Sequence, residues 1–134
     1  MLSAYNLCKI LGYNYNNIWN LKVELEEDFF EDVLTTALFD GIGYWFNYLE
    51  KEVVMTDKYE YIEDAILEEE GFIEITYEGE KYMLNLNSLI NGYKMYCQRA
   101  IERERVVHTD AGLIDSELAD VIIQLGVFGK IIFG

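Results

Sequence analysis

The chain has 134 residues, of which 25 are acidic and 10 are lysine or arginine, so its net charge is −15 at neutral pH. Hydrophobic residues make up 51% of the chain, which is enough for one buried core and argues against an intrinsically disordered protein. No apolar stretch approaches the roughly 20 residues needed to cross a bilayer, and the N-terminus does not follow the pattern of a signal peptide. We therefore expect one cytoplasmic domain.

The two cysteines also indicate the cytoplasm. Cys8 and Cys97 are far apart and neither belongs to a Cys-x-x-Cys pair. We predict two buried free thiols in a reducing environment.

The negative charge is concentrated in the middle of the chain. Residues 23–70 hold sixteen acidic side chains and only two basic ones, Lys51 and Lys58, whereas residues 1–22 contain no acid. Such a block repels nucleic-acid phosphates and anionic membranes, and it attracts basic protein surfaces. The simpler alternative is a solvated acidic face that keeps the protein soluble.

In chain order, the first predicted element is a short helix over residues 3–11 that ends at Gly12. The partly alternating segment 18–25 is compatible with a strand or a helix. An amphipathic helix is predicted over 28–39, because its apolar side chains recur at spacings of three and four.

An aromatic segment over 44–49 and a short strand over 52–56 follow. A second acidic helix is then predicted over 59–70. In such a helix Glu60, Asp64 and Glu68 would form one row of carboxylates, because residues four apart are neighbours on a helix surface.

The C-terminal half contains the clearest local signal, a hairpin of strands 72–77 and 81–86 joined by a three-residue loop. A helix capped by Asn87 or Ser88 is predicted to reach residue 105. After a loop over 106–113, a helix over 116–125 begins at its cap Asp115. Residues 128–134 are expected to form a short strand or a packed tail. The fold class is therefore α+β, a single domain of four to five helices around a small antiparallel sheet that contains the 72–86 hairpin.

Catalytic and metal-binding patterns are poorly supported. The acids of 110–120 lack the spacing of a calcium loop, and His108 is the only histidine. The Gly-x-Gly at 41–43 follows a helix, which is the wrong context for a phosphate loop. We expect no enzyme activity, no metal and no cofactor.

Two stretches, 34–45 and 110–134, resemble small uncharacterised proteins encoded by bacteriophages and prophages. The second includes Ala119-Asp120-Val121-Ile122-Ile123-Gln124 and the terminal 128–134 segment, Phe-Gly-Lys-Ile-Ile-Phe-Gly. The chain departs from the usual pattern at 39–40, where Glu-Gly is common, and at Lys130, where an acid is common. The resemblance implies a phage origin. Small acidic phage proteins often inhibit host machinery, including CRISPR effectors, restriction systems and polymerases.

The leading hypothesis is an anti-CRISPR or other anti-defence protein that docks an acidic, nucleic-acid-mimicking face onto a basic host protein, with no direct contact to nucleic acid. Its predicted partner-binding residues are Glu24, Glu26, Glu27, Glu31, Asp32, Glu60, Glu63, Asp64, Glu68, Glu69 and Glu70.

Two alternatives remain open. Lys94, Arg99, Arg103 and Arg105, with His108, could grip the phosphate of a small nucleotide and so sequester a signal. The plainer interpretation pairs these bases with the protein's own acids. The other alternative is a phage structural or assembly protein that uses an aromatic surface, which would also allow a homodimer.

Overall fold

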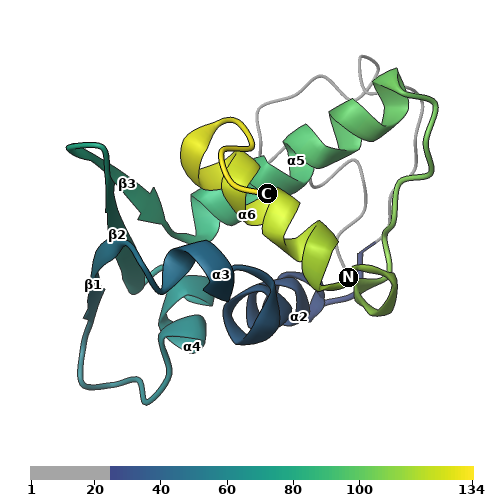
Figure 1. Ribbon diagram of the computed structural model, residues 1–134. Helices are drawn as coiled ribbons and strands as arrows, with labels where there is room; N and C mark the ends of the chain where they lie inside the picture. Colours follow the sequence, from purple (N-terminus) through teal and green to yellow (C-terminus); the bar gives the residue numbers. More distant parts are fainter. Residues whose placement is uncertain (1–24) are drawn as a thin grey trace.

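The computed structural model describes residues 25–134, and the predicted helix over 3–11 lies outside this part of the chain, as does nearly all of the 18–25 segment. Within the described part, five α-helices and one three-stranded antiparallel sheet confirm the predicted α+β class (Figure 1). The helices are α2 (Phe29–Thr36), α3 (Gly43–Phe46), α4 (Ile62–Leu67), α5 (Leu86–Glu102) and α6 (Ser116–Phe128). The strands are β1 (Glu50–Met55), β2 (Gly71–Tyr77) and β3 (Glu80–Leu84), paired in the order β1-β2-β3.

Helix α2 ends in a wider turn than the sequence predicts. The chain is α-helical from Phe29 to Thr36 and then forms one π-helical turn, η2 (Ala37–Gly41). At the end of that turn a side chain on Gly41 would place its Cβ 2.6 Å from the main-chain oxygen of Ser116. Glycine therefore lets the backbone of η2 lie directly against the start of α6.

The second acidic helix is much shorter than the predicted 59–70. It ends in a turn in which Glu69 has a φ of 59° and the Glu70 N–H donates to the carbonyl of Ala65 at 2.8 Å. The next residue, Gly71, pairs with Met55 in the sheet, so the chain has to leave the helix at this point. The predicted row of Glu60, Asp64 and Glu68 is therefore wrong, because only Asp64 lies within α4.

The predicted hairpin is present, with a tighter loop. Tyr77 pairs with Glu80, which leaves a two-residue loop instead of the predicted three. Glu78 and Gly79 both have positive φ, 49° and 79°, as a type I′ turn requires.

Helix α5 begins earlier than predicted because Asn85 is its cap. The Asn85 side chain accepts from the Ser88 N–H at 2.9 Å, and the Ser88 hydroxyl accepts from the Asn85 N–H at 2.8 Å. This reciprocal capping box makes Ser88 the third helical residue and not the cap. Asp115 caps α6 as predicted, through the Leu118 N–H at 2.8 Å, although α6 continues to Phe128.

Helices α5 and α6 cross in close contact and form the centre of the core. A Cβ on Gly92 would lie 2.0 Å from the main-chain oxygen of Ile122, and one on Gly126 would lie 1.9 Å from that of Ser88. Two glycines that face each other thus allow the two backbones to touch. The sheet adds Ile73, Ile75 and Leu84 to this core, whereas every residue of β1 is exposed.

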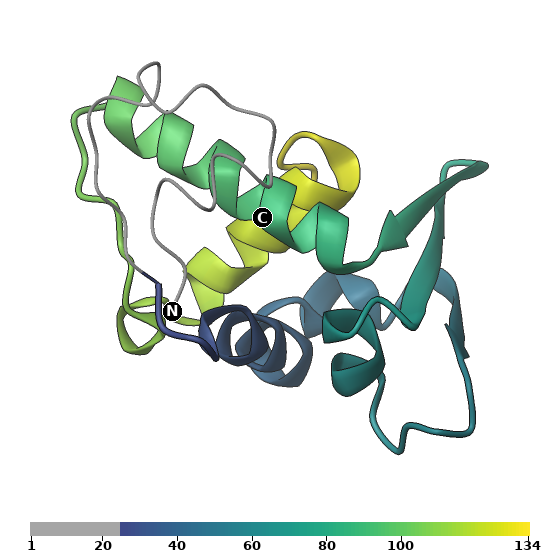
Figure 2. The same ribbon diagram turned by 180° about the vertical axis from the view of Figure 1, so that it is seen from behind.

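The arrangement is elongated along α5. Figures 1 and 2 show the sheet at one end of the molecule and the C-terminal end of α5 at the other. The 17 residues of α5 span about 25 Å at 1.5 Å per residue, so the two ends are well separated. Among the described helices, none has the length and apolar character required to cross a membrane.

Candidate functional site

A largely buried polar network, with Tyr44 at its exposed edge, joins α3, α6 and the C-terminal tail. Asp120 is 7% exposed and Gln124 is fully buried. The Asp120 carboxylate accepts from the Tyr44 hydroxyl at 2.5 Å, from the Trp45 Nε1–H at 2.8 Å and from the Gln124 amide at 2.9 Å. The Gln124 Oε1 accepts from the main-chain N–H of Phe133 at 2.9 Å, so it holds the tail against α6. We call Tyr44, Trp45, Asp120 and Gln124 the α6 network.

The α6 network brings together the two stretches that carry the phage resemblance. Tyr44 and Trp45 close the first stretch, and Asp120 and Gln124 lie in the second. The ring of Phe133 stacks on Trp45 with centroids 5.1 Å apart, which confirms a packed tail. Burial, reinforced by the hydrogen bond to Asp120, raises the pKa of Tyr44 to about 12. These contacts give the four residues of the α6 network a role in folding.

The two acidic segments, far apart in the sequence, lie side by side because α2 packs against α4 (Figure 1). Their side chains are exposed, except for the half-buried Glu63. Glu24 lies outside the described residues. We call the acidic surface the set formed by Glu26, Glu27, Asp28, Glu31, Asp32, Glu60, Glu63, Asp64, Glu68, Glu69 and Glu70.

The acidic surface contains a hollow of about 660 Å³. Carboxylates at and just before the start of α2, such as Glu27 and Glu31, line one part of it, and no basic residue within 25–134 does so. Phe30, Leu67 and Leu86 contribute apolar walls from α2, α4 and the first turn of α5. The hollow therefore combines negative charge with apolar contact area.

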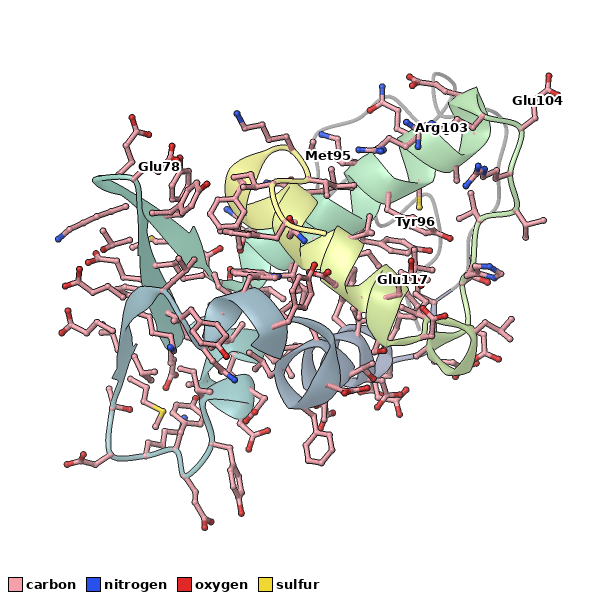
Figure 3. The ribbon with its side chains drawn as sticks, viewed as in Figure 1. Glu78, Met95, Tyr96, Arg103, Glu104 and Glu117 are labelled. Atoms are coloured by element: carbon pink, nitrogen blue, oxygen red, sulfur yellow. The ribbon has the colours of Figure 1, made fainter. Side chains whose placement is uncertain are left out.

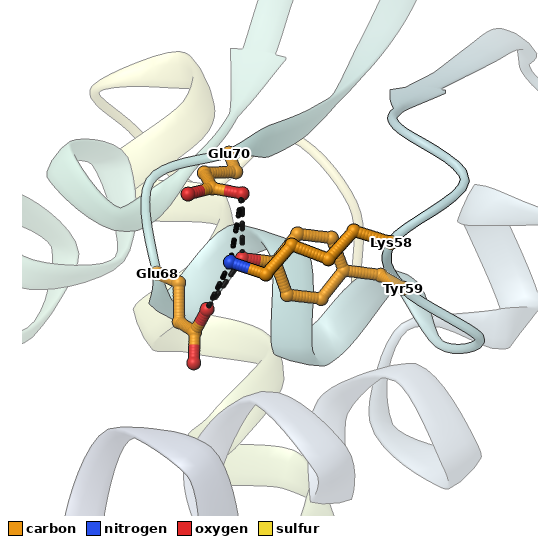
Figure 4. A network of polar contacts seen from close by, with 4 residues as sticks. All are labelled: Lys58, Tyr59, Glu68 and Glu70. Carbon is orange, nitrogen blue, oxygen red and sulfur yellow. Dashed lines mark hydrogen bonds and ion pairs between the residues drawn. The ribbon is translucent and has the colours of Figure 1, made fainter.

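One part of the acidic surface is partly neutralised within the protein (Figure 4). Lys58 lies 3.6 Å from Glu70 and 3.9 Å from Glu68, and the Tyr59 hydroxyl donates to both carboxylates. The hydrogen bond from Tyr59 is the main cause of the lowered pKa of Glu70, with Lys58 adding to it, while the bond to Glu68 raises the pKa of Tyr59. Glu68 and Glu70 are thus less available to a partner than the carboxylates of α2, for which the described residues show no ion pair.

Negative charge also lies outside the acidic surface. Figure 3 shows Glu78 at the hairpin tip, Glu104 beyond the end of α5 and Glu117 at the start of α6, three places well apart from one another. The acidic surface is therefore a local concentration of charge on a molecule that is acidic in several places.

The arginines, unlike the lysines, are gathered in one place. Arg99, Arg103 and Arg105 line one cavity of about 390 Å³ together with His108. These are all of the arginines and the only histidine in the chain. Lys94, which the sequence grouped with them, lies on α5 but does not line this cavity. We call the cavity lined by Arg99, Arg103, Arg105 and His108 the arginine cavity.

Sequence reasoning found the arginines by their spacing and missed the rest of the cavity. Arg103, the C-cap of α5, is four residues after Arg99, so the two lie on the same face of the helix end. The apolar residues that complete the cavity come from α6 and from the tail, at Leu118, Val121 and Ile131. No local pattern connects these segments with the end of α5.

The predicted alternative of internal ion pairs for the arginines is not what the structure shows. Within residues 25–134, the ion pairs involve Lys58 and Lys81, and none joins an arginine to Glu102 or Glu104. Cys97 is buried as predicted, and burial raises the pKa of its thiol to about 12. Cys8 lies outside the described residues.

The described residues contain no group of histidine, cysteine, aspartate and glutamate side chains arranged to hold a metal ion. Comparison of the chain with protein-family models, with curated proteins and with solved structures gives no match. The candidate sites therefore rest on their own geometry.

Proposed function

We propose that the protein is a phage-encoded inhibitor of a host nucleic-acid-binding machine, with a CRISPR effector as the leading candidate. It would act in the host cytoplasm and dock the acidic surface onto the groove that otherwise holds nucleic acid. The observation that supports this is the packing of α2 against α4, which joins two sequence-distant acidic segments into one surface. A duplex presents one negative charge per roughly 1.7 Å of its axis, so a dense set of carboxylates competes for the same lysines and arginines.

The hollow in the acidic surface suits a basic side chain of the partner. The aliphatic stem of a lysine or arginine would pack on Phe30, Leu67 and Leu86, and its charged head would face Glu27 and Glu31. A single exposed ion pair contributes only about 0.2–1 kcal/mol. Affinity therefore requires several such contacts together, and long-range attraction mainly speeds association.

The start of α2 should matter more than the end of α4. Glu68 and Glu70 already contact Lys58 and Tyr59, so their charge is partly used within the protein. Glu26, Glu27 and Glu31 form no ion pair among the described residues and line the hollow. Replacing these three glutamates by neutral glutamines should therefore weaken partner binding most.

The test compares two triple variants of equal net charge. Glu26→Gln/Glu27→Gln/Glu31→Gln removes three charges from the hollow, and Glu78→Gln/Glu80→Gln/Glu102→Gln removes three exposed charges from the hairpin and α5. Each tagged protein is used to capture partners from a nuclease-treated bacterial lysate. A captured nucleic-acid-binding protein is then assayed for release of a fluorescent duplex at about 50 and 300 mM salt.

We expect wild type and the Glu78/Glu80/Glu102 variant to release the duplex from the captured protein at low salt. The Glu26/Glu27/Glu31 variant should need at least about tenfold more protein for the same release. High salt should weaken release by wild type sharply. Equal release by both variants, or captured proteins that keep their duplex bound, would contradict the proposal. So would the absence of any captured nucleic-acid-binding protein.

A role in assembly through apolar contacts remains the competing hypothesis. Phe39 and Tyr48 are 91% and 85% exposed, which provides aromatic contact area on the surface. Association through such side chains changes little with salt, because it buries apolar area. Capture that persists at 300 mM salt and is lost in Phe39→Ala would therefore favour assembly over mimicry.

A further inference from the structure

The arginine cavity concentrates positive charge on a protein of net charge −15. Its charged groups come from the end of α5 and the segment after it: Arg99 lies on α5, Arg103 is the C-cap of that helix, and Arg105 and His108 follow. Among the described residues that line it, none is acidic. Arg99 and Arg103 repel each other, since like charges four apart on a helix are destabilising. The negative end of the α5 dipole offsets only part of this repulsion.

The loop that carries Arg105 and His108 is held in place by α5. The Tyr93 hydroxyl donates to the main-chain oxygen of His108 at 2.9 Å, and the His108 N–H donates to the Tyr96 hydroxyl at 2.8 Å. Tyr93 is fully buried, so the anchoring helix face is part of the core. The loop is thereby positioned before any ligand arrives, which lowers the entropy lost on binding.

The end of α5 turns the chain back toward the cavity. The Arg105 N–H donates to the carbonyl of Ala100 at 2.7 Å, and the Glu104 N–H donates to that of Ile101 at 3.0 Å. Glu104 adopts a left-handed φ of 54° to make this turn. The result is that Arg105, although beyond the helix, lines the same cavity as Arg99.

The guanidinium groups of the arginine cavity have N–H donors available for a ligand. Each arginine carries five N–H donors in a fork that matches phosphate geometry. The described residues provide no ion pair to any of the three arginines. Three forks that line one cavity can contact the oxygens of more than one phosphate group, so the cavity suits a ligand with a chain of phosphates.

The rest of the cavity is apolar. Leu118 and Val121 lie one turn apart on α6, and Ala100 lies between the arginines on α5. A volume of about 390 Å³ falls within the usual range for small-molecule pockets, roughly 300–1,000 Å³. An apolar wall beside three guanidinium groups suits a molecule with an uncharged ring at one end and phosphates at the other.

We propose that the arginine cavity binds a nucleoside polyphosphate, with the phosphates on Arg99, Arg103 and Arg105 and the nucleoside against the α6 side. The site is independent of the acidic surface, because the two lie at opposite ends of α5. A protein that fails as an inhibitor of a nucleic-acid-binding machine would still bind this ligand.

The test is calorimetric titration of the full chain, in low-salt buffer, with four probes: ATP, inorganic pyrophosphate, adenosine and a short single-stranded oligonucleotide. Two variants are compared with wild type. Arg99→Gln/Arg103→Gln removes two guanidinium groups, and Lys51→Gln/Lys81→Gln removes two charges on the sheet. Circular dichroism and a thermal melt confirm that each variant is folded.

We expect ATP to bind wild type and the lysine variant equally, and the arginine variant at least about tenfold more weakly. Pyrophosphate should bind with the same dependence on the arginines but more weakly than ATP, because it lacks the nucleoside. Adenosine alone should bind more weakly still, with no dependence on the arginines.

Three results would overturn the proposal. The first is no heat with ATP or pyrophosphate at millimolar concentration, and the second is equal loss of ATP binding in both variants, which would indicate diffuse electrostatics. The third is tight binding of a short single-stranded oligonucleotide together with weak binding of ATP, which would assign the cavity to nucleic acid. A pyrophosphate affinity equal to that of ATP would exclude the nucleoside contact.

Discussion

The α6 network and the arginine cavity are both clusters of polar side chains beside α6, and they differ in how their hydrogen bonds are used. In the α6 network, Asp120 and Gln124 find their partners within the protein, and no buried side-chain nitrogen or oxygen among the described residues lacks one. In the arginine cavity, Arg103 and Arg105 are exposed and have no ion pair in the described chain.

This contrast separates a folding role from a binding role. A buried polar group must be satisfied internally, since leaving it unpaired costs about 1–3 kcal/mol. An exposed guanidinium pays no such cost, because water hydrates it until a ligand arrives. Variants of the first cluster should therefore change stability, and variants of the second should change ligand binding.

The largest effect is expected for Asp120→Ala. Its loss leaves the Trp45 Nε1–H and the Gln124 amide without their buried acceptor. We expect the free energy of unfolding to fall by about 2–6 kcal/mol, because each of these two neutral buried donors costs about 1–3 kcal/mol when it is left without an acceptor. Urea unfolding followed by tryptophan fluorescence measures this change.

The control for that variant is Glu117→Ala, which removes an exposed carboxylate from the same helix. It should cost no more than about 1 kcal/mol, through the helix dipole. Similar losses for the two variants would mean that the α6 network does not stabilise the fold.

A smaller effect is expected from alkaline pH through Tyr44. Its pKa is about 12 in the folded protein against 10.0 in an unfolded chain, so the unfolded state loses this proton first. The stability that the hydroxyl contributes is complete below pH 10 and disappears as pH rises toward 12. The stability difference between wild type and Tyr44→Phe should therefore shrink over this interval.

Unfolding curves of both proteins at pH 8, 10 and 11.5 measure that difference. The remaining tyrosines are common to both proteins, so their ionisation cancels. A difference that stays constant from pH 8 to 11.5 would show that Tyr44 is not coupled to Asp120.

Glu104→Gly should stabilise the protein by about 0.5–1 kcal/mol. Glu104 holds a left-handed φ of 54° at the end of α5, a conformation that glycine adopts without strain. Thermal unfolding should show a higher midpoint. Glu102→Gly, still within the helix, should instead lower the midpoint, because glycine is unfavourable there.

The smallest effect is expected for Arg99→Gln/Arg103→Gln. Because neither arginine has an ion pair in the described chain, the free energy of unfolding should change by less than about 0.5 kcal/mol. Urea unfolding at low ionic strength measures it. A loss above about 1.5 kcal/mol would show that the arginines serve the fold.

Much of the fold was predictable because local signals are strong at several points. Glu78 and Gly79 mark a turn between two alternating runs, and Asp115 is a good cap before an apolar run. The length of α4 was not predictable, because pairing of Gly71 with Met55 ends the helix before its acidic pattern stops. The burial of Asp120 had a signal that was missed: Asp120 and Gln124 are four apart, within an otherwise apolar helix face.

The sequence by itself determined the α+β class, the hairpin and the acidic character of α2 and α4, because these depend on residues close together in the chain. Only the tertiary structure decided that α2 and α4 share a surface, that Asp120 meets Trp45, and that Val121 and Ile131 complete a cavity with the arginines. Each of those outcomes joins segments distant in sequence. Helices α5 and α6, which line the cavity, cross closely at Gly92 and Gly126, and α2 packs against α4; no local pattern specifies either contact.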